Sequence, residues 1–254
     1  MTAPQFRSLL VVDAEGFSKH PDARLPALHT EIREALDAAC EASGLGEVWR
    51  SADFQQSTGD GILALLPHEA TPALVHPFVD RLQDVLAGAA RRLRADGIRL
   101  RLRVALHVGL VDDRHPVTAG ISTATNDVSR LLDSAPLRAA LTGSDPDVTF
   151  AALIVSAEVF DTYVRGGHVD GLPPSRFTQV RVKVKQFDRP AYLYVPAPSA
   201  REKDPAPEQA PGRAAAQQPP APSGLSLNGV TISGDGNQNA FGNWTGGDLR
   251  QERG

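Results

Sequence analysis

Apolar and polar residues alternate in blocks along residues 1–196, and these blocks predict strands interspersed with helices. The run SLLVVDAEGF (8–17) is continuously apolar until Asp13, which is typical of a buried strand with a polar end. Apolar residues recur at helical spacing over 23–43, and a second amphipathic helix is predicted over 70–95, where basic residues end the pattern. The chain therefore begins with a strand and continues with helices long enough to cover a sheet.

The segment 47–67 predicts a hairpin, with the turn at Gly59-Asp60-Gly61, since Asp-Gly is a strong hairpin signal. Residues 99–111 alternate cleanly and predict a long strand that is half exposed. Pro136 is expected to bend or divide the helix predicted over 124–141. The remaining predicted elements are a strand at 150–156, a short helix at 157–164 and a hairpin over 179–196. This order predicts an α+β fold with a ferredoxin-like core, an antiparallel-rich central sheet flanked by helices.

Composition divides the chain into three predicted regions, of which residues 1–196 form the folded domain. Residues 197–224 are rich in Pro, Ala and Gln and have almost no large apolar side chains, so they are predicted to be a disordered linker. Residues 225–254 again contain Leu, Val, Ile, Phe and Trp among Gly and Asn, so the tail is not simply more linker.

Charge and cysteine content exclude several classes of function. The chain has 26 basic and 30 acidic side chains, which is too even a balance to indicate nucleic-acid binding. Its single cysteine, Cys40, excludes a disulfide framework and a cysteine zinc site, and is expected to be a buried apolar group. No segment resembles a signal peptide or a membrane span, so we expect a soluble cytoplasmic protein with no membrane partner.

Two carboxylates are the strongest candidates for chemistry. Asp13 ends a buried strand and Asp60 lies in a hairpin turn, and in a ferredoxin-like core those two points lie side by side. Neighbouring carboxylates repel, and a divalent cation relieves the repulsion while it binds phosphate oxygens. Alternatively, Asp60 is only the residue that such turns prefer, and Asp13 is a cap.

Five motifs in order resemble the class III nucleotidyl cyclases over residues 7–196. The first two are VVDAEGFS (11–18), matching Asp-x-x-Gly-Phe-Ser, and GDGILALLP (59–67), matching the Gly-Asp-Gly hairpin. They are followed by RVALHVGLV (103–111) with its His-x-Gly end, and by NDVSRLLDSAPL (126–137) with Asn and Arg four residues apart. The last is KQFDRPAYLYV (185–195), which has Gln186 where bacterial members have Gly.

This resemblance implies a class III cyclase fold and a set of roles. Asp13 and Asp60 would hold two Mg²⁺ or Mn²⁺ ions, and the backbone amides of residues 14–17 would bind the triphosphate, with Gly16 allowing close approach and Phe17 ending this loop. The other implied roles are ribose positioning by Asn126, stabilisation of the α-phosphate by Arg130 and neutralisation of the terminal phosphates by Lys185. Asn126 and Arg130 would act together because residues at i and i+4 share one helix face.

Each of these roles has a structural alternative. Arg130 could be a surface ion pair with Asp127 or Asp133, and Lys185 could be one of several exposed strand lysines. His107 invites an acid/base role, but in this family it is mainly structural, at a strand end.

Departures from the family pattern leave the base open. Adenylate cyclases carry Lys, and guanylate cyclases Glu, where this chain has Gln56, whose amide both donates and accepts. Thr118 and Ser122 are the polar candidates for the second base-reading position, and pyrimidine nucleotides stay possible. The connection between His107 and residue 126 is short, and Asp127 stands where small apolar residues are usual, so both weaken the expectation of activity.

The tail, LNGVTISGDGNQNAFGNWTGGDL (227–249), has two short β-prone pieces among Gly, Asp and Asn. Stacked copies could form Asn/Gln ladders in a cross-β arrangement. The pattern resembles bacterial amyloid-like signalling motifs, which recruit a partner protein bearing a matching sequence. A loose hairpin or a disordered tail is the alternative.

These observations give a leading hypothesis and its rivals. The chain would be a homodimeric, metal-dependent cyclase in bacterial signalling or defence, converting a nucleoside triphosphate to a cyclic 3′,5′-nucleotide and pyrophosphate, with sites formed between subunits. The rival is a catalytically weak or inactive cyclase-like adaptor that signals through assembly of its tail. A diguanylate-cyclase-like enzyme is disfavoured because the doubled-Gly, double-acid hairpin of that family is missing.

Overall fold

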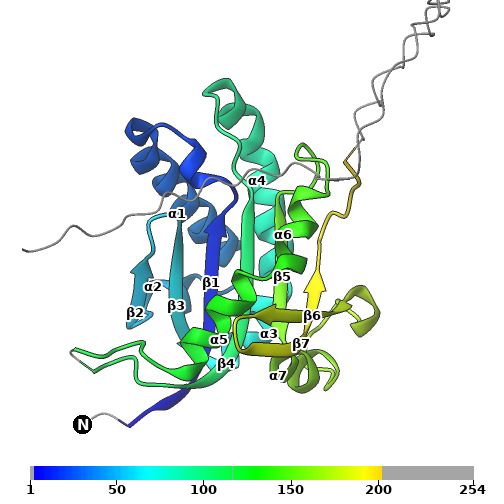
Figure 1. The fold of residues 1–254 in the computed structure, drawn as a ribbon. Coiled ribbons are helices and arrows are strands. Elements are labelled where there is room, and N and C mark those ends of the chain that lie inside the picture. Colours follow the sequence, from blue (N-terminus) through cyan, green and yellow to red (C-terminus); the bar gives the residue numbers. More distant parts are fainter. Residues whose placement is uncertain (1–2, 116, 202–254) are drawn as a thin grey trace, which may run out of the picture. The chain divides into compact units, whose positions relative to one another are not determined.

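A computed structural model describes residues 3–115 and 117–201. Seven strands form one sheet in the order β2-β3-β1-β4-β5-β7-β6 (Figure 1). The strands are β1 (Gln5–Ala14), β2 (Phe54–Ser57), β3 (Gly61–Pro67), β4 (Leu102–Val111), β5 (Ala151–Ser156), β6 (Thr178–Val184) and β7 (Phe187–Tyr194). The helices are α1 (Leu25–Ala42), α2 (Gly46–Arg50), α3 (Thr71–Val75), α4 (Phe78–Ala95), α5 (Thr123–Leu132), α6 (Ala135–Thr142) and α7 (Ala157–Val159), the last continued by a π-helical turn (Phe160–Val164). Short 3-10 turns lie at Phe17–Lys19, Asp22–Arg24, His68–Ala70 and Pro174–Arg176.

Antiparallel pairing dominates the sheet, as the sequence predicts. Strand β1 lies antiparallel between β3 and β4, and only β4 and β5 pair in parallel among the described strands. The predicted order of strands and helices and the α+β class are confirmed. Because β1 lies in the middle of the sheet, the residues at its end have a neighbouring strand on each side.

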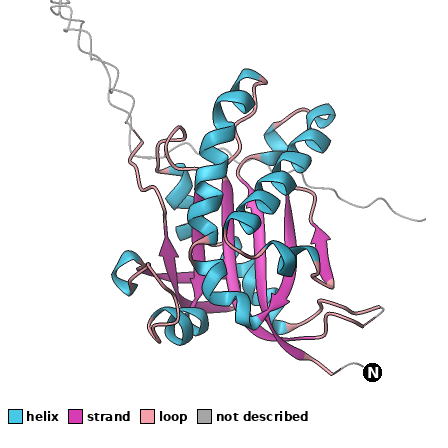
Figure 2. Ribbon diagram, turned by 180° about the vertical axis from the view of Figure 1, so that it is seen from behind, coloured by secondary structure: helices cyan, strands magenta, loops and turns pink. Residues whose placement is uncertain are grey.

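The centre of the sheet is buried on both faces. Alternate residues of β1 enter two separate cores, Leu10 and Val12 on one face, and Leu9 and Val11 on the other. Helices α1 and α4 cover the first face, as Figure 2 shows, and α5 and α6 cover the second. The expectation that the 99–111 strand is half exposed is wrong, because α5 and α6 cover its second face and most of β4 is buried.

Two predicted elements have boundaries that the sequence pattern did not place, and a third divides as expected. Only the start of the expected hairpin over 47–67 is wrong: it is helix α2, since Trp49 is buried against the core and donates a 2.5 Å hydrogen bond to Asp37 on α1. Strands β2 and β3 form the rest of the hairpin as predicted. The helix predicted over 70–95 is divided into α3 and α4 at Pro77. The division expected near Pro136 is confirmed, because α5 ends at Leu132 and α6 begins at Ala135.

Past Pro196 the described chain runs alongside the loop between α6 and β5. The hydroxyl of Thr149 donates to the carbonyl of Ala197 at 2.5 Å, and the amide of Arg201 donates to the carbonyl of Gly143 at 3.0 Å. The predicted linker beyond Arg201 and the predicted assembly motif (225–254) lie outside the described residues. Between residues 3 and 201, none of the described helices has the length and apolar character needed to cross a bilayer.

Candidate active site

The end of β1 brings the two predicted metal carboxylates together. In the sheet register Asp13 lies opposite Gly61 on β3 and Arg103 on β4, and the amide of Ala14 donates to the carbonyl of Asp60 at 2.9 Å. A Cβ on Gly61 would lie 1.9 Å from the carbonyl oxygen of Val12, so only glycine fits there. The backbone of the Gly-Asp-Gly turn therefore packs directly against the end of β1.

Burial and neighbouring charges act on Asp13 together. Burial raises the pKa of the Asp13 carboxyl to about 7, the Arg103 guanidinium opposes this rise, and the Asp60 carboxylate adds to it. Arg103 forms an ion pair with Oδ2 of Asp13, while the buried Oδ1 has no hydrogen-bond partner among the described residues. A buried carboxylate oxygen without a donor is a position that a cation would satisfy.

The loop after β1 presents amides beside this pair. Gly16 has a φ of 69°, a left-handed conformation that favours glycine, and it precedes the short 3-10 turn that begins at Phe17. The amides of Ala14 and Glu15 donate to the carbonyls of Asp60 and Arg101, each at 2.9 Å. Within the described ranges no backbone acceptor pairs with the amides of Gly16 and Phe17, so these two, rather than all four, can bind a phosphate.

A basic cleft of about 490 Å³ opens beside Gly16. Its single lining carboxylate, Glu15, is paired with Arg101 at 3.0 Å, so the remaining charge of the cleft is positive. Arg101 also donates from Nε to the carbonyl of Thr149 at 2.9 Å and is buried, so it is a structural cation. The lining residues are Glu15, Gly16, Lys19, His20, Arg99, Arg101, Arg103, Arg138, Thr142, Pro146 and Arg201.

The donor set at Asp13 and Asp60 fits magnesium or manganese bound together with a phosphate. Mg²⁺ in phosphoryl-transfer sites commonly takes one or two protein carboxylates and completes its shell with water and substrate oxygens. Between residues 3 and 201, excluding 116, no three or more His, Cys, Asp or Glu side chains gather as a metal centre, so a fully protein-bound ion is not supported. The orphaned Oδ1 of Asp13 beside Asp60 matches the two-carboxylate arrangement instead.

The remaining predicted groups lie on α5 and on the β6–β7 hairpin. Asn126 is exposed on α5. Arg130, on the same helix face, donates to Oδ1 of Asp127 at 2.9 Å and lies 5.8 Å from the centre of the Phe187 ring. The ion pair weighed as an alternative for Arg130 is thus present, with Asp127 rather than Asp133 as its partner.

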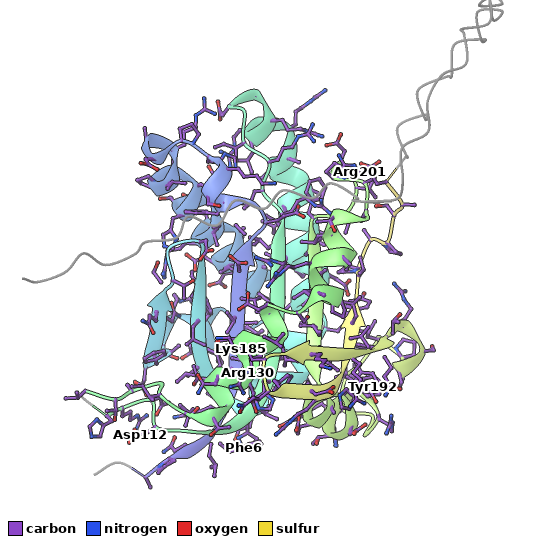
Figure 3. All side chains as sticks on the ribbon, viewed as in Figure 1. Phe6, Asp112, Arg130, Lys185, Tyr192 and Arg201 are labelled. Carbon is purple, nitrogen blue, oxygen red and sulfur yellow. The ribbon has the colours of Figure 1, made fainter. Side chains whose placement is uncertain are left out.

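Lys185 occupies the turn of the β6–β7 hairpin, and Figure 3 shows it labelled next to Arg130 of α5. The hairpin contacts α5 through Phe187, whose ring faces the Arg130 guanidinium. Lys185 is exposed and has a φ of 53°, and no other non-glycine residue among those described has a positive φ. A long side chain in this conformation costs on the order of 1 kcal/mol relative to glycine. The turn therefore has a lysine at a position where the left-handed backbone conformation favours glycine.

Gln56 lies on the edge strand β2. Its register partner is Leu63, which in turn pairs with Val11, so the three residues share the sheet face that α5 and α6 cover. The side chain is exposed, unlike that of Gln55, which donates to the carbonyl of Trp49 at 2.5 Å. Gln56 is therefore free to bind a ligand on the face where Asp13 lies.

Within one chain these groups form two separate halves. Arg103 lies beside Asp13, whereas His107, four residues further along β4, lines a cavity with Asp127 of α5. Four residues of strand span about 13 Å. The structure thus brings Asp13, Asp60, Gly16 and Phe17 together, and it places Asn126, Arg130 and Lys185 in a second group elsewhere.

The chain is similar to known proteins in its structure. No protein-family model matches the chain, and no curated protein does. The adenylyl cyclase CyaB from P. aeruginosa superposes with a TM-score of 0.50 at 16% identity, over 79% of this chain and 98% of that one. The guanylyl cyclase Cya2 gives 0.48 at 16% identity over 82% and 98%, and a bacterial light-regulated adenylyl cyclase gives 0.49 at 16% identity over 78% and 55%.

The chain has the class III nucleotidyl cyclase fold. At such low identity the likeness concerns the fold alone. Within this cyclase fold, Arg103 is the site residue that the sequence reasoning missed. A signal was present, because Arg99, Arg101 and Arg103 alternate in the segment 99–111 that the sequence predicts as one strand, and such spacing would place all three on one face.

Proposed function

We propose that this protein is a metal-dependent nucleotidyl cyclase that converts a nucleoside triphosphate to a cyclic 3′,5′-nucleotide and pyrophosphate. The observation that carries the proposal is the pairing of Asp13 with Asp60 beside the Gly16 loop and the basic cleft. In this reaction the ribose 3′-oxygen forms a bond to the α-phosphorus and loses its proton to solvent. The bond from the α-phosphorus to the bridging oxygen breaks, and pyrophosphate leaves with the electron pair.

The first half of the site would bind the phosphates. Asp13 and Asp60 would hold one or two Mg²⁺ or Mn²⁺ ions, which when bound supply charge stabilisation for phosphoryl transfer. The amides of Gly16 and Phe17 and the Arg103 guanidinium would orient phosphate oxygens, since Arg103 already lies against Asp13. The negative charge of a nucleotide bound there would lie among the cations of the basic cleft, in which Glu15 is the one lining carboxylate.

The second half would act on the sugar and the base. Asn126 would position the ribose, Arg130 would stabilise charge on the α-phosphate, and Lys185 would neutralise the terminal phosphates. The Lys185 conformation supports this role, because strained backbone persists where a side chain is needed for function. Gln56 would read the base, and its amide accommodates more than one base edge.

Since the two halves lie apart within one chain, a complete site would form between two copies. The start of β1 and the end of β4 carry a suitable apolar surface, because Phe6 and Leu110 are cross-strand partners and are 45% and 63% exposed. Large apolar side chains exposed side by side indicate an interaction surface. Homodimerisation is therefore part of the proposal, as is a role of residues 225–254 in assembly with a partner protein of matching sequence.

The test is to incubate the full chain with Mn²⁺ and each of the four nucleoside triphosphates and to identify products by mass spectrometry. We expect one cyclic monophosphate, which names the base, and a loss on the order of 100-fold or more in Asp60→Ala. Asp96→Ala, an exposed carboxylate at the end of α4, is the matched control and should keep full activity. A folded protein that makes no product from any nucleotide would overturn the enzyme proposal and favour the inactive, adaptor-type cyclase.

A further inference from the structure

A second cavity lies beneath α5, between this helix, β7 and the start of α7. Its volume is about 220 Å³, and a cavity of roughly 150 Å³ is already enough to bind benzene in a protein interior. It is separate from the basic cleft, with which it shares no lining residue. The lining residues are His107, Asp127, Leu131, Ser156, Ala157, Glu158, Phe187, Arg189 and Pro190.

One polar atom in the wall of this cavity has no partner in the described part of the chain. The His107 side chain is 9% exposed, its Nδ1 is buried without a hydrogen bond, and Oε2 of Glu158 lies 3.8 Å from it. Burial lowers the pKa of His107, against the pull of Glu158 and Asp127, so the ring is neutral at pH 7. A neutral ring with a free nitrogen can exchange a hydrogen bond with a bound molecule.

Among the side chains that line the cavity, carboxylates outnumber guanidinium groups. Two carboxylates, Asp127 and Glu158, line the cavity, against one guanidinium, that of Arg189. Arg189 lies 3.8 Å from Asp127 and 3.7 Å from Glu158, longer than hydrogen bonds, and its side chain is 55% exposed. The buried carboxylate of Asp127 therefore has one close donor, Arg130 on Oδ1, and only a loose partner on Oδ2.

The other residues that line the cavity suit a ligand with an apolar part next to its positive charge. Leu131, Ala157 and Pro190 are aliphatic, and the Phe187 ring presents a face that two guanidinium groups already approach. Those of Arg130 and Arg189 lie 5.8 Å and 5.5 Å from its centre, within cation–π range. An aromatic face, two carboxylates and a free imidazole nitrogen are the groups that recognise an organic cation.

We propose that this cavity is a binding site for a small organic cation, an amine or guanidine on a short apolar chain. The cation would lie between Asp127 and Glu158, with its chain along Leu131 and Phe187 and an N–H directed at Nδ1 of His107. Asp127 belongs both to this wall and to the Arg130 ion pair, so an occupant would compete with Arg130 for the carboxylate. An effect of this competition on catalysis by Arg130 rests on the proposed function, whereas the binding of the cation does not.

Agmatine, which carries a guanidinium and an ammonium on a four-carbon chain, is the probe. It would be titrated into the full chain without nucleotide or metal, and the ring signals of ¹⁵N-labelled histidines would be followed by NMR. The His107 signals are identified by their loss in His107→Gln. We expect a saturable shift of these signals, with affinity weakened about tenfold or more in Glu158→Gln.

Two comparisons keep this test decisive. Glu69→Gln, which changes an exposed carboxylate on another part of the surface, should bind agmatine like the unaltered chain. Acetate, as an anion of small size, should leave the His107 signals in place. Absence of a saturable shift, equal affinity in Glu158→Gln, or a stronger response to acetate would each overturn the proposal, and none of these readouts depends on whether the protein is a cyclase.

Discussion

Two arginines of the candidate site form ion pairs with aspartates of the same chain. Arg103 lies on Asp13, and Arg130 lies on Asp127. Both pairs place a cation that we propose to bind phosphate against a carboxylate. In the proposed function, a triphosphate would replace each carboxylate as the partner of its cation, and in the chain alone each ion pair balances its two charges locally.

His107 permits a prediction about pH at the same scale. Burial holds its pKa below the ordinary value, so below about pH 6.5 the unfolded chain takes up a proton that the folded chain resists. Stability from this residue is present above pH 6.5 and is lost as the pH falls toward its folded pKa. In His107→Gln, the loss of unfolding free energy between pH 7.5 and pH 5.0 should be smaller than in the unaltered chain.

Urea unfolding at the two pH values measures this difference. His168→Gln, at an exposed position, is the control and should follow the unaltered chain. An equal pH dependence in His107→Gln and the unaltered chain would mean that the burial of this ring is not what makes stability sensitive to acid.

Among the elements, α4 and β5 are joined by one buried side chain. Oε1 of Gln83 accepts from the amides of Phe150 and Ala151 at 2.8 Å and 3.0 Å, and its Nε2 donates to the carbonyl of Val148 at 2.9 Å. The amide thus completes the backbone bonding where β5 begins. This connection aligns β5 with β4, which carries Arg103 and His107.

Replacing Gln83 by Leu keeps the volume but removes these three bonds. Two buried amides and one carbonyl would lose their partner, so the free energy of unfolding should fall by roughly 2–4 kcal/mol. Thermal or urea denaturation of Gln83→Leu beside Gln179→Leu, an exposed position on β6, separates this loss from the general effect of a glutamine replacement. Similar stability of the two variants would contradict the role assigned to Gln83.

At the scale of the whole described chain, residues 197–201 belong to the domain that precedes them. The amide of Asp145 donates to the Ser199 hydroxyl at 2.9 Å, and this hydroxyl lies 2.7 Å from that of Thr149. Together with the bonds of Ala197 and Arg201, these contacts close the loop that leads into β5.

A chain shortened to residue 201 should therefore be more stable than one shortened to residue 196. We expect a difference of roughly 1–3 kcal/mol, because the buried Thr149 hydroxyl and the Asp145 amide lose partners in the shorter chain. Melting temperatures of the two chains and of the full chain measure it. Ser199→Ala in the 201-residue chain should account for part of the loss, and identical melting of the two shortened chains would show that these contacts contribute nothing.

Much of the fold could be predicted because local sequence patterns specify which segments form strands and helices. The order of strands and helices and the division before Pro136 followed from periodicity and proline chemistry. The start of the predicted hairpin was wrong because residues 47–50 fit either a short strand or a helical turn, and the contact of Trp49 with Asp37 on α1 favours the helix. The second face of β4 was misjudged because its cover comes from helices that lie later in the chain.

For the site, the sequence by itself determined the candidate residues, since Asp13, Asp60 and Gly16 belong to short motifs that can be recognised locally. Only the tertiary structure decided what those residues touch. Asp13 and Arg103 are 90 positions apart, and only the antiparallel register of β1 and β4 makes them partners. The cavity at His107 likewise exists only once α5, α7 and β7 pack around β4, because burial and desolvation are properties of the assembled core and of no segment alone.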